Sequence, residues 1–142
     1  SAFLLNRSSD LLVKENKPNF KVVIAGSRGF SNYKLLYEKC NEVLHEKSKT
    51  HNIVIVSGHA KGADLLGERY SQDKDYDLEI FPANWKKFGK SAGFRRNEQM
   101  AEVADGLIAF WDGKSHGTEH MIKIAEEKGI ETRVINYGTE KV

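Results

Sequence analysis

The chain has 142 residues, enough for one ordinary domain that buries about two-thirds of the surface of its unfolded chain. Its 22 Lys and Arg residues nearly balance 20 Asp and Glu residues, and a formal charge of +2 with scattered cations argues against a general nucleic-acid binder. The single cysteine, Cys40, excludes an internal disulfide and a thiolate zinc cluster, which favours a reducing, cytoplasmic setting.

The first residues are expected to lie outside the main domain. Residues 1–19 hold two short apolar patches that polar residues interrupt, without the continuous apolar centre of a signal peptide. No stretch of the sequence reaches the roughly 20 consecutive apolar residues of a transmembrane helix, so we expect no membrane partner. We predict an arm or short helix over residues 1–19, of open role, and a single domain over residues 20–142.

The first half of the domain reads as strand, helix, strand and helix. The two strand segments are β-branched and nearly continuously apolar, as expected for strands covered on both faces. The helix between them has apolar residues at helical spacing, and Ser31 or Asn32 is a suitable cap for its start. These four elements fall at residues 20–26, 27–49, 52–58 and 60–72.

The second half continues the alternation. Pro82 should end the third strand, and Gly129 should stop the last helix. Residues 82–93 have no clear period, and an irregular insertion of this length is commonly functional. The remaining predicted elements are strands at residues 78–83, 106–111 and 131–137 and helices at residues 94–104 and 116–129.

This order of elements determines the fold class. Strands that are separated by crossover helices pair in parallel, and nearly unbroken apolar strands indicate helices on both faces of the sheet. The sequence therefore predicts an α/β domain of three layers, with a parallel sheet of about five strands flanked by helices.

Three loops rich in glycine follow predicted strands, at the edge where open parallel sheets bind ligands. Their sequences are GSRGF, SGHAKGAD and DGKSHGT. Glycine lets backbone N–H groups approach a ligand, and the helix that follows favours an anion. Each loop alone is compatible with an ordinary turn, but three at one edge favour a ligand that carries phosphate. The candidate ligand-binding residues of these loops are Gly26, Ser27, Arg28, Ser57, Gly58, Lys61, Gly62, Asp112, Gly113, Ser115, Gly117 and Thr118.

Three further side chains are candidates for the same site. Arg96 is expected near a helix start, where a cation opposes the helix dipole unless an anion lies nearby. Asp64, in the first turn of its helix, is compatible with a dipole interaction and equally with binding of ribose hydroxyls. Trp85, among lysines in residues 82–93, suits stacking on a base and equally suits plugging the edge of the core.

The sequence predicts neither a metal ion nor a cofactor. Among the histidines only His116 and His120 have helical i, i+4 spacing, and no HExxH motif surrounds them. The glycine loops match neither the Walker loop nor the GxGxxG spacing, which disfavours an ordinary ATPase or dinucleotide site.

Four ordered motifs resemble the YspA-like (YpsA-related) branch of the SLOG superfamily. They are GSRGF, SGHAKGAD, FPANWKKFGKSAGFRRNEQM and ADGLIAFWDGKSHGTEHMI, within residues 20–137. The resemblance implies a Rossmann-like fold and the binding of nucleotides or nucleotide-derived ligands. Distant relatives include the LONELY GUY phosphoribohydrolases and the DNA-processing protein of bacterial transformation.

The phosphoribohydrolase pattern separates binding from catalysis. The residues that match it, with Asn97 in place of the family's Lys and with a longer second loop, are Arg96, Asn97, Met100, Gly113, Gly117 and Thr118. The family's catalytic Glu position falls on Met121, although N-glycosidic cleavage needs a carboxylate near the ribose. Candidate catalytic substitutes are Asp64, Asp112 and Glu119. Glu119 lies about 200° around the helix from Met121, so we expect it to point elsewhere.

The sequence therefore predicts a domain that binds a nucleotide or nucleotide-derived ligand, either ADP-ribose-like or a nucleoside phosphate, as a sensor, carrier or sequestering protein. A nucleotide-processing enzyme, such as an N-glycosidic hydrolase or transferase, is one alternative. A single-stranded nucleic-acid-binding module is another, although we do not expect nucleic acid as a partner. Self-association as a homo-oligomer stays open.

Overall fold

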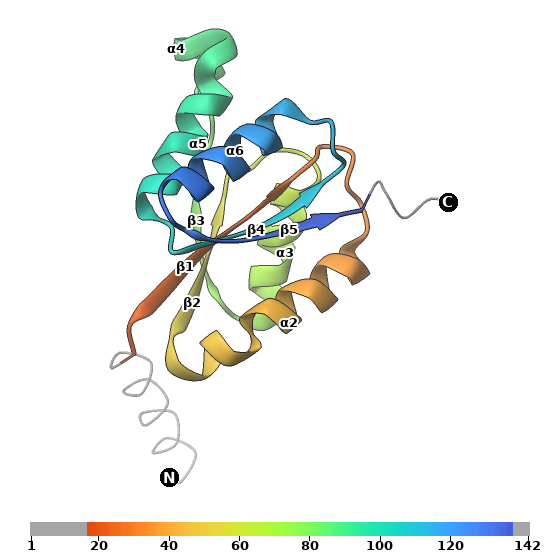
Figure 1. Ribbon diagram of the computed structural model, residues 1–142, viewed down its shortest axis with the longest axis vertical. Coiled ribbons are helices and arrows are strands. Elements are labelled where there is room, and N and C mark those ends of the chain that lie inside the picture. Colours follow the sequence, from red (N-terminus) through yellow and green to blue (C-terminus); the bar gives the residue numbers. More distant parts are fainter. Residues whose placement is uncertain (1–16, 138–142) are drawn as a thin grey trace, which may run out of the picture.

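The computed structural model describes residues 17–137, and its centre is one parallel sheet (Figure 1). The strand order across the sheet is β3-β2-β1-β4-β5. All four strand pairings are parallel. The strands are β1 (Asn19–Gly26), β2 (Asn52–Ser57), β3 (Asp77–Ile80), β4 (Gly106–Trp111) and β5 (Glu131–Asn136).

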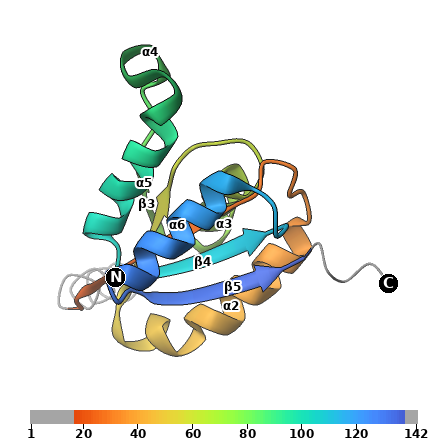
Figure 2. The ribbon, with the colours of Figure 1, turned by 45° about the horizontal axis from the view of Figure 1, so that its top comes forward.

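Helices cover both faces of this sheet (Figures 1 and 2). The helices are α2 (Tyr33–Thr50), α3 (Ala63–Lys74), α4 (Trp85–Phe88), α5 (Ala92–Val103) and α6 (His116–Glu127), with a 3-10 turn at Gly89–Ser91. Helices α2 and α3 pack on one face, and α5 and α6 on the other. The predicted three-layer, Rossmann-like α/β fold is thereby confirmed.

The core follows from the alternation of side chains along buried strands. In β1, Val22 and Ile24 face α2 and α3, whereas Val23 and Ala25 face α5 and α6. Burying one of these valine or isoleucine side chains contributes about 1.5 to 3 kcal/mol relative to leaving it exposed. Because both faces of β1 are buried, its sequence is an almost unbroken apolar run. The same burial holds the carboxyl end of β1 in place, and the first glycine loop begins there.

Most predicted boundaries agree with the structure to within a few residues. Of the two predicted caps for α2, Asn32 is the one used, since its side-chain oxygen accepts a hydrogen bond from the Leu35 N–H at 3.0 Å. Gly129 has φ +72° just after α6 and ends the helix as predicted. Strand β1 begins at Asn19, inside the predicted arm. Residues 1–16 lie outside the described residues, so the arm itself stays a prediction.

Two predictions around the third strand were wrong. Strand β3 ends at Ile80 rather than at residue 83, because Pro82 follows the last paired N–H, that of Phe81. Residues 82–93 are not irregular but hold α4, the 3-10 turn and the start of α5. Asn84 caps α4, because its side-chain oxygen accepts a hydrogen bond from the Lys87 N–H at 3.0 Å. This cap was overlooked in the sequence because no helical spacing of apolar residues follows it.

The segment from α4 to the first half of α5 projects away from the rest of the domain (Figure 2). Its residues Trp85 and Phe94 line hollows together with residues of the glycine loops, so the segment supplies a wall that the sheet alone would not provide. Within residues 17–137, no helix has both the length and the apolar character to cross a bilayer.

Candidate functional site

The loops after β1, β2 and β4 meet at the carboxyl edge of the sheet, and Ser27 joins them. Its carbonyl oxygen accepts a hydrogen bond from the Ala63 N–H at 3.4 Å. Its hydroxyl oxygen accepts from the Asp112 N–H at 3.1 Å and from the Ser115 hydroxyl at 3.0 Å. Gly62, with φ +84°, lies against Ser27 so closely that a Cβ would come within 2.3 Å of the Ser27 carbonyl oxygen. Ser27 and Gly62 thus hold the three loops together without lining the cleft themselves.

A cleft of two adjoining hollows opens in front of these loops. The first hollow, of about 410 Å³, lies between α5 and the start of α6 and is lined by residues that include Asp64, Phe94, Thr118 and Met121. The second hollow, of about 350 Å³, is lined by residues that include Gly58, His59 and Lys61. Three side chains line both hollows, namely Arg28, Trp85 and Arg96. Another hollow of about 350 Å³, beside Phe20 and Arg133, lies away from these loops.

Arg96 connects α5 to the loop after β2. Its Nη1 donates a short hydrogen bond to the Gly58 carbonyl oxygen, and its Nε donates to Asn97 Oδ1 at 3.1 Å. Burial lowers the pKa of Arg96, and nearby Asp64 opposes that shift. No hydrogen bond to another described residue uses Nη2, so the guanidinium retains donors for a ligand. Since α5 begins at Ala92, Arg96 lies beyond the first turn, and the predicted conflict with the helix dipole is absent.

Asp64 is the buried carboxylate of the cleft, with 5% of its surface exposed. Its Oδ2 accepts a hydrogen bond from the Ala60 N–H at 3.3 Å. Burial raises the pKa of Asp64 to about 6, although this hydrogen bond and the charges of Arg96 and Arg28 act in the opposite direction. A Cβ on Gly58 would come within 2.7 Å of Arg96 Nη1 and 2.8 Å of Asp64 Oδ2. Glycine is thus required there to let both side chains approach the loop.

The loop after β2 uses part of its backbone internally. The His59 N–H donates to Ser57 Oγ at 3.0 Å, and the Ala60 N–H donates to Asp64 Oδ2 at 3.3 Å. Two of the N–H groups that a phosphate-binding loop would offer are therefore occupied. Side-chain cations are the more available groups for an anion in this part of the cleft.

The start of α6 offers backbone donors instead. Ser115 precedes the helix, but its side chain makes no capping hydrogen bond because its hydroxyl is directed to Ser27 and Asp112. Gly117 and Thr118, in the first turn, line the first hollow. The open N–H groups of this turn, with the positive end of the helix dipole, favour an anion there.

The three candidate catalytic carboxylates are placed differently. Asp112 accepts hydrogen bonds from the Lys114 N–H and the Ser115 N–H, both at 2.8 Å, and these hold its pKa down at about 2. It shapes its own loop and does not line the cleft. Glu119 lies with Lys123 at a separate depression on α6, as its helical angle predicted. Of the three, only Asp64 lines the cleft.

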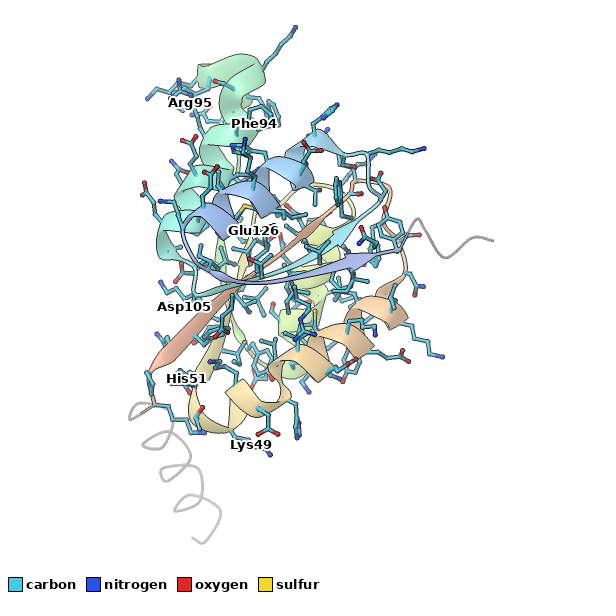
Figure 3. The ribbon with its side chains drawn as sticks, in the orientation of Figure 1. Lys49, His51, Phe94, Arg95, Asp105 and Glu126 are labelled. Carbon is cyan, nitrogen blue, oxygen red and sulfur yellow. The ribbon has the colours of Figure 1, made fainter. Side chains whose placement is uncertain are left out.

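Exposed aromatic rings form one side of the cleft. Trp85 is 49% exposed and lies below the Arg28 guanidinium, whose carbon is 5.9 Å from the ring centroid. This exposure argues against the alternative that Trp85 plugs the core. Phe94 is 45% exposed and lies 4.4 Å from the His120 ring, on the side of α5 that faces α6 (Figure 3). Both rings are available to a planar group.

Sequence reasoning named some residues that support the cleft without lining it, and it missed others. Predicted ligand-binding residues behind or beside the cleft are Gly26, Ser27, Ser57, Gly62, Asp112 and Gly113. Those that line it are Arg28, Gly58, Lys61, Asp64, Trp85, Arg96, Ser115, Gly117 and Thr118. Two residues were missed: Phe94, which lines the first hollow, and Glu68, whose carboxylate is hydrogen-bonded to the ring of His59. Glu68 shares a helix face with Asp64 at i, i+4. Within residues 17–137, no group of three His, Cys, Asp or Glu residues is arranged to hold a metal.

Comparisons with known proteins find relatives of the sequence and of the fold. The sequence model of the YspA, cpYpsA-related SLOG family matches residues 20–88. The Gene 61 protein of Mycobacterium phage D29 is 33% identical over 124 residues, which cover 83% of this chain and 96% of that protein.

Two solved structures share the fold. DNA processing protein A of Streptococcus pneumoniae superposes with a TM-score of 0.63 at 20% identity, over 91% of this chain and 53% of that one. DNA processing protein A of Helicobacter pylori, which binds single-stranded DNA, superposes with a TM-score of 0.60 at 18% identity, over 91% of this chain and 70% of that one. At these identities the similarity concerns the fold alone.

Proposed function

Because the chain belongs to the YspA, cpYpsA-related SLOG family, we propose that its cleft binds a nucleotide or nucleotide-derived ligand, as a sensor, carrier or sequestering protein. The observation that carries this proposal is the placement of Arg28, Trp85 and Arg96 at the junction of both hollows. Two guanidinium groups beside an exposed indole match a ligand that joins a phosphate to a flat ring.

The charges of the cleft favour an anion. Its lining includes the cations Arg28, Lys61, Lys90 and Arg96, whereas Asp64 is the acidic residue that lines it. The open first turn of α6 adds donors on the side of the first hollow. We place the phosphate between the arginines and this turn, and the base in the first hollow against Trp85 and Phe94.

The residues that line the first hollow favour binding of the ligand without turnover. Met121, 1% exposed, forms the wall where the phosphoribohydrolase pattern has its catalytic Glu. Of the three candidate catalytic carboxylates, an enzyme would have to use Asp64, whose carboxylate is held by the Ala60 N–H. The enzymatic alternative therefore depends on one residue.

A thermal-shift screen tests the proposal. The full chain is mixed separately with AMP, ADP, ADP-ribose and cyclic ADP-ribose. Each stabilising ligand is recovered after incubation, and its mass is determined by mass spectrometry. We expect at least one ligand to raise the melting temperature and to be recovered intact. Release of base and sugar phosphate would establish an enzyme instead, and no stabilisation by any of the four would contradict the proposal.

Trp85 provides a direct report of occupancy. We expect the stabilising ligand to quench tryptophan fluorescence, because a base stacked on the exposed indole of Trp85 can accept an electron from the excited ring. Trp85→Phe should abolish the change and weaken binding by about 1 kcal/mol or less, since an aromatic face remains. Trp111, whose Nε1 donates to the Ser115 carbonyl oxygen at 3.1 Å, supplies the internal comparison. Quenching that persists in Trp85→Phe would place the ligand elsewhere.

Single-stranded DNA is the second candidate ligand, favoured by the fold of the Helicobacter pylori protein and by the cationic, aromatic lining of the cleft. Titration of a fluorescent oligothymidylate at several salt concentrations separates the two. We expect weak binding with a shallow dependence on salt, because the four cations that line the cleft can neutralise at most about four phosphates. A steep slope, with affinity above that for every nucleotide, would favour the DNA-binding alternative.

A further inference from the structure

A hydrogen-bonded chain of three side chains lies behind the second hollow. Glu68 Oε2 accepts hydrogen bonds from Ser57 Oγ and from His59 Nδ1, both at 2.8 Å. Ser57 is fully buried, and the Glu68 side chain is only 16% exposed, whereas the His59 side chain is half exposed and lines the second hollow. The chain thus runs from the interior to the cleft and ends in an imidazole.

The backbone of His59 is held in an uncommon conformation. Its φ of +60° lies in the left-handed region, which is unfavourable for a residue with a Cβ. Contacts on both sides maintain it, because Ser57 Oγ accepts from the His59 N–H and Arg96 donates to the carbonyl oxygen of Gly58. The position of the ring is therefore determined by the surrounding structure.

The carboxylate partner determines which ring nitrogen carries the proton. A carboxylate accepts hydrogen bonds, so Nδ1 is the donor toward Glu68. In the neutral ring, Nε2 on the opposite side then has a free lone pair. Arg28, Lys61 and Arg96, which line the same hollow, present only donors. In the neutral imidazole, His59 Nε2 is thus an acceptor among donors, and a hydroxyl group fits it where a phosphate oxygen, which has no proton, does not.

We propose that His59 Nε2 accepts a hydrogen bond from a ligand hydroxyl, so that the second hollow receives a sugar attached beyond the phosphate. Glu68 is the positioning residue that orients the imidazole. This inference rests on the proposed nucleotide binding and specifies its ligand as a nucleotide whose phosphate carries a further polyol. The two hollows then hold the two ends of one ligand, with Arg28 and Arg96 at its phosphates.

Isothermal titration of the full chain with ADP and with ADP-ribose tests the inference, since ADP-ribose carries a terminal ribose on the β-phosphate, where ADP carries one further ionisable oxygen. We expect wild type to prefer ADP-ribose by about three- to tenfold, the worth of one hydrogen bond. His59→Asn, which tolerates a left-handed φ, should remove the preference by weakening ADP-ribose binding more than ADP binding. His45→Ala, on the exposed side of α2, is the matched control and should retain it.

The outcomes separate this inference from the function on which it rests. Equal weakening of both probes by His59→Asn would place the imidazole on a phosphate and overturn the inference, as would an unchanged preference. If neither probe binds to wild type, the inference is overturned, whereas the proposed function falls only if AMP and cyclic ADP-ribose fail in the thermal-shift screen as well.

Glu68→Gln tests the positioning role by spectroscopy. In long-range ¹H–¹⁵N spectra at alkaline pH, with His59→Asn identifying the signals, we expect wild-type His59 to be protonated at Nδ1. Glu68→Gln should shift the proton toward Nε2 and reduce the preference for ADP-ribose. A merely structural Glu68 would leave the tautomer unchanged, and that result would contradict the role.

Discussion

Asp64→Asn should raise the free energy of unfolding at pH 7 by roughly 2 to 3 kcal/mol. Burial raises the pKa of Asp64 from 3.8 to about 6, and each pKa unit corresponds to about 1.4 kcal/mol. The native state therefore binds more protons than the unfolded chain between about pH 4 and pH 6, and stability falls as the pH rises through this window. Asparagine remains neutral and keeps an oxygen for the Ala60 N–H, so it avoids the cost of the buried charge.

Urea unfolding of wild type and Asp64→Asn at pH 4, 5 and 7 measures this effect. The difference should be small at pH 4 and reach its full size at pH 7. Asp112→Asn is an informative control with the opposite sign, because hydrogen bonds lower the pKa of Asp112 to about 2 and its charge stabilises the loop at neutral pH. Equal stability of Asp64→Asn and wild type at pH 7, or a gain that does not depend on pH, would contradict the prediction.

A charge that destabilises the fold is expected where function requires it. Asp64 lines the first hollow beside two arginines, whereas the carboxylate of Asp112 is used within its own loop. Strongly shifted pKa values in a cleft are typical of ligand sites, and natural proteins accept some loss of stability there. The two aspartates, which sequence reasoning treated alike, are thus separated by burial.

The architecture could be predicted because its signals are local. The apolar runs of the strands, the cap at Asn32 and the stop at Gly129 each act within a few residues. The edge strand β3 was harder to predict, since its residues are mostly exposed and show no apolar run, and since Pro82 limits its length. Helix α4 was missed because four residues are too few to show a period.

The site was harder to predict than the fold because its contacts join distant segments. Arg96 reaches the carbonyl oxygen of Gly58, 38 residues earlier in the chain. Asn97 Nδ2 donates to the Gly117 carbonyl oxygen, 20 residues later, and joins α5 to α6. Glycine loops indicated where a ligand binds, but not which polar groups the protein uses itself. The N–H groups of His59 and Ala60 are engaged in this way, which no spacing rule reveals.

Arg96→Ala should weaken binding of the stabilising nucleotide by about 1.5 to 3 kcal/mol, which is roughly 10- to 150-fold. The substitution removes a half-buried cation from the junction of the two hollows. It also leaves the Gly58 carbonyl oxygen without the donor that holds the loop after β2. Isothermal titration gives the affinity, and a thermal melt without ligand shows whether the fold persists.

Two further variants distinguish the contact from net charge. Arg95→Ala also removes one cation from α5. Arg95 is exposed, donates a hydrogen bond from Nε to Ser91 Oγ at 3.1 Å and points away from α6 (Figure 3). Ligand affinity should therefore stay within about twofold of the wild-type value. Arg96→Lys keeps the charge and loses the planar fork, so its affinity should fall between those of wild type and Arg96→Ala. Equal losses in Arg95→Ala and Arg96→Ala would indicate that only overall charge matters. Unchanged affinity in Arg96→Ala would remove the guanidinium from the site, and the phosphate would then have to depend on Arg28 and the open first turn of α6.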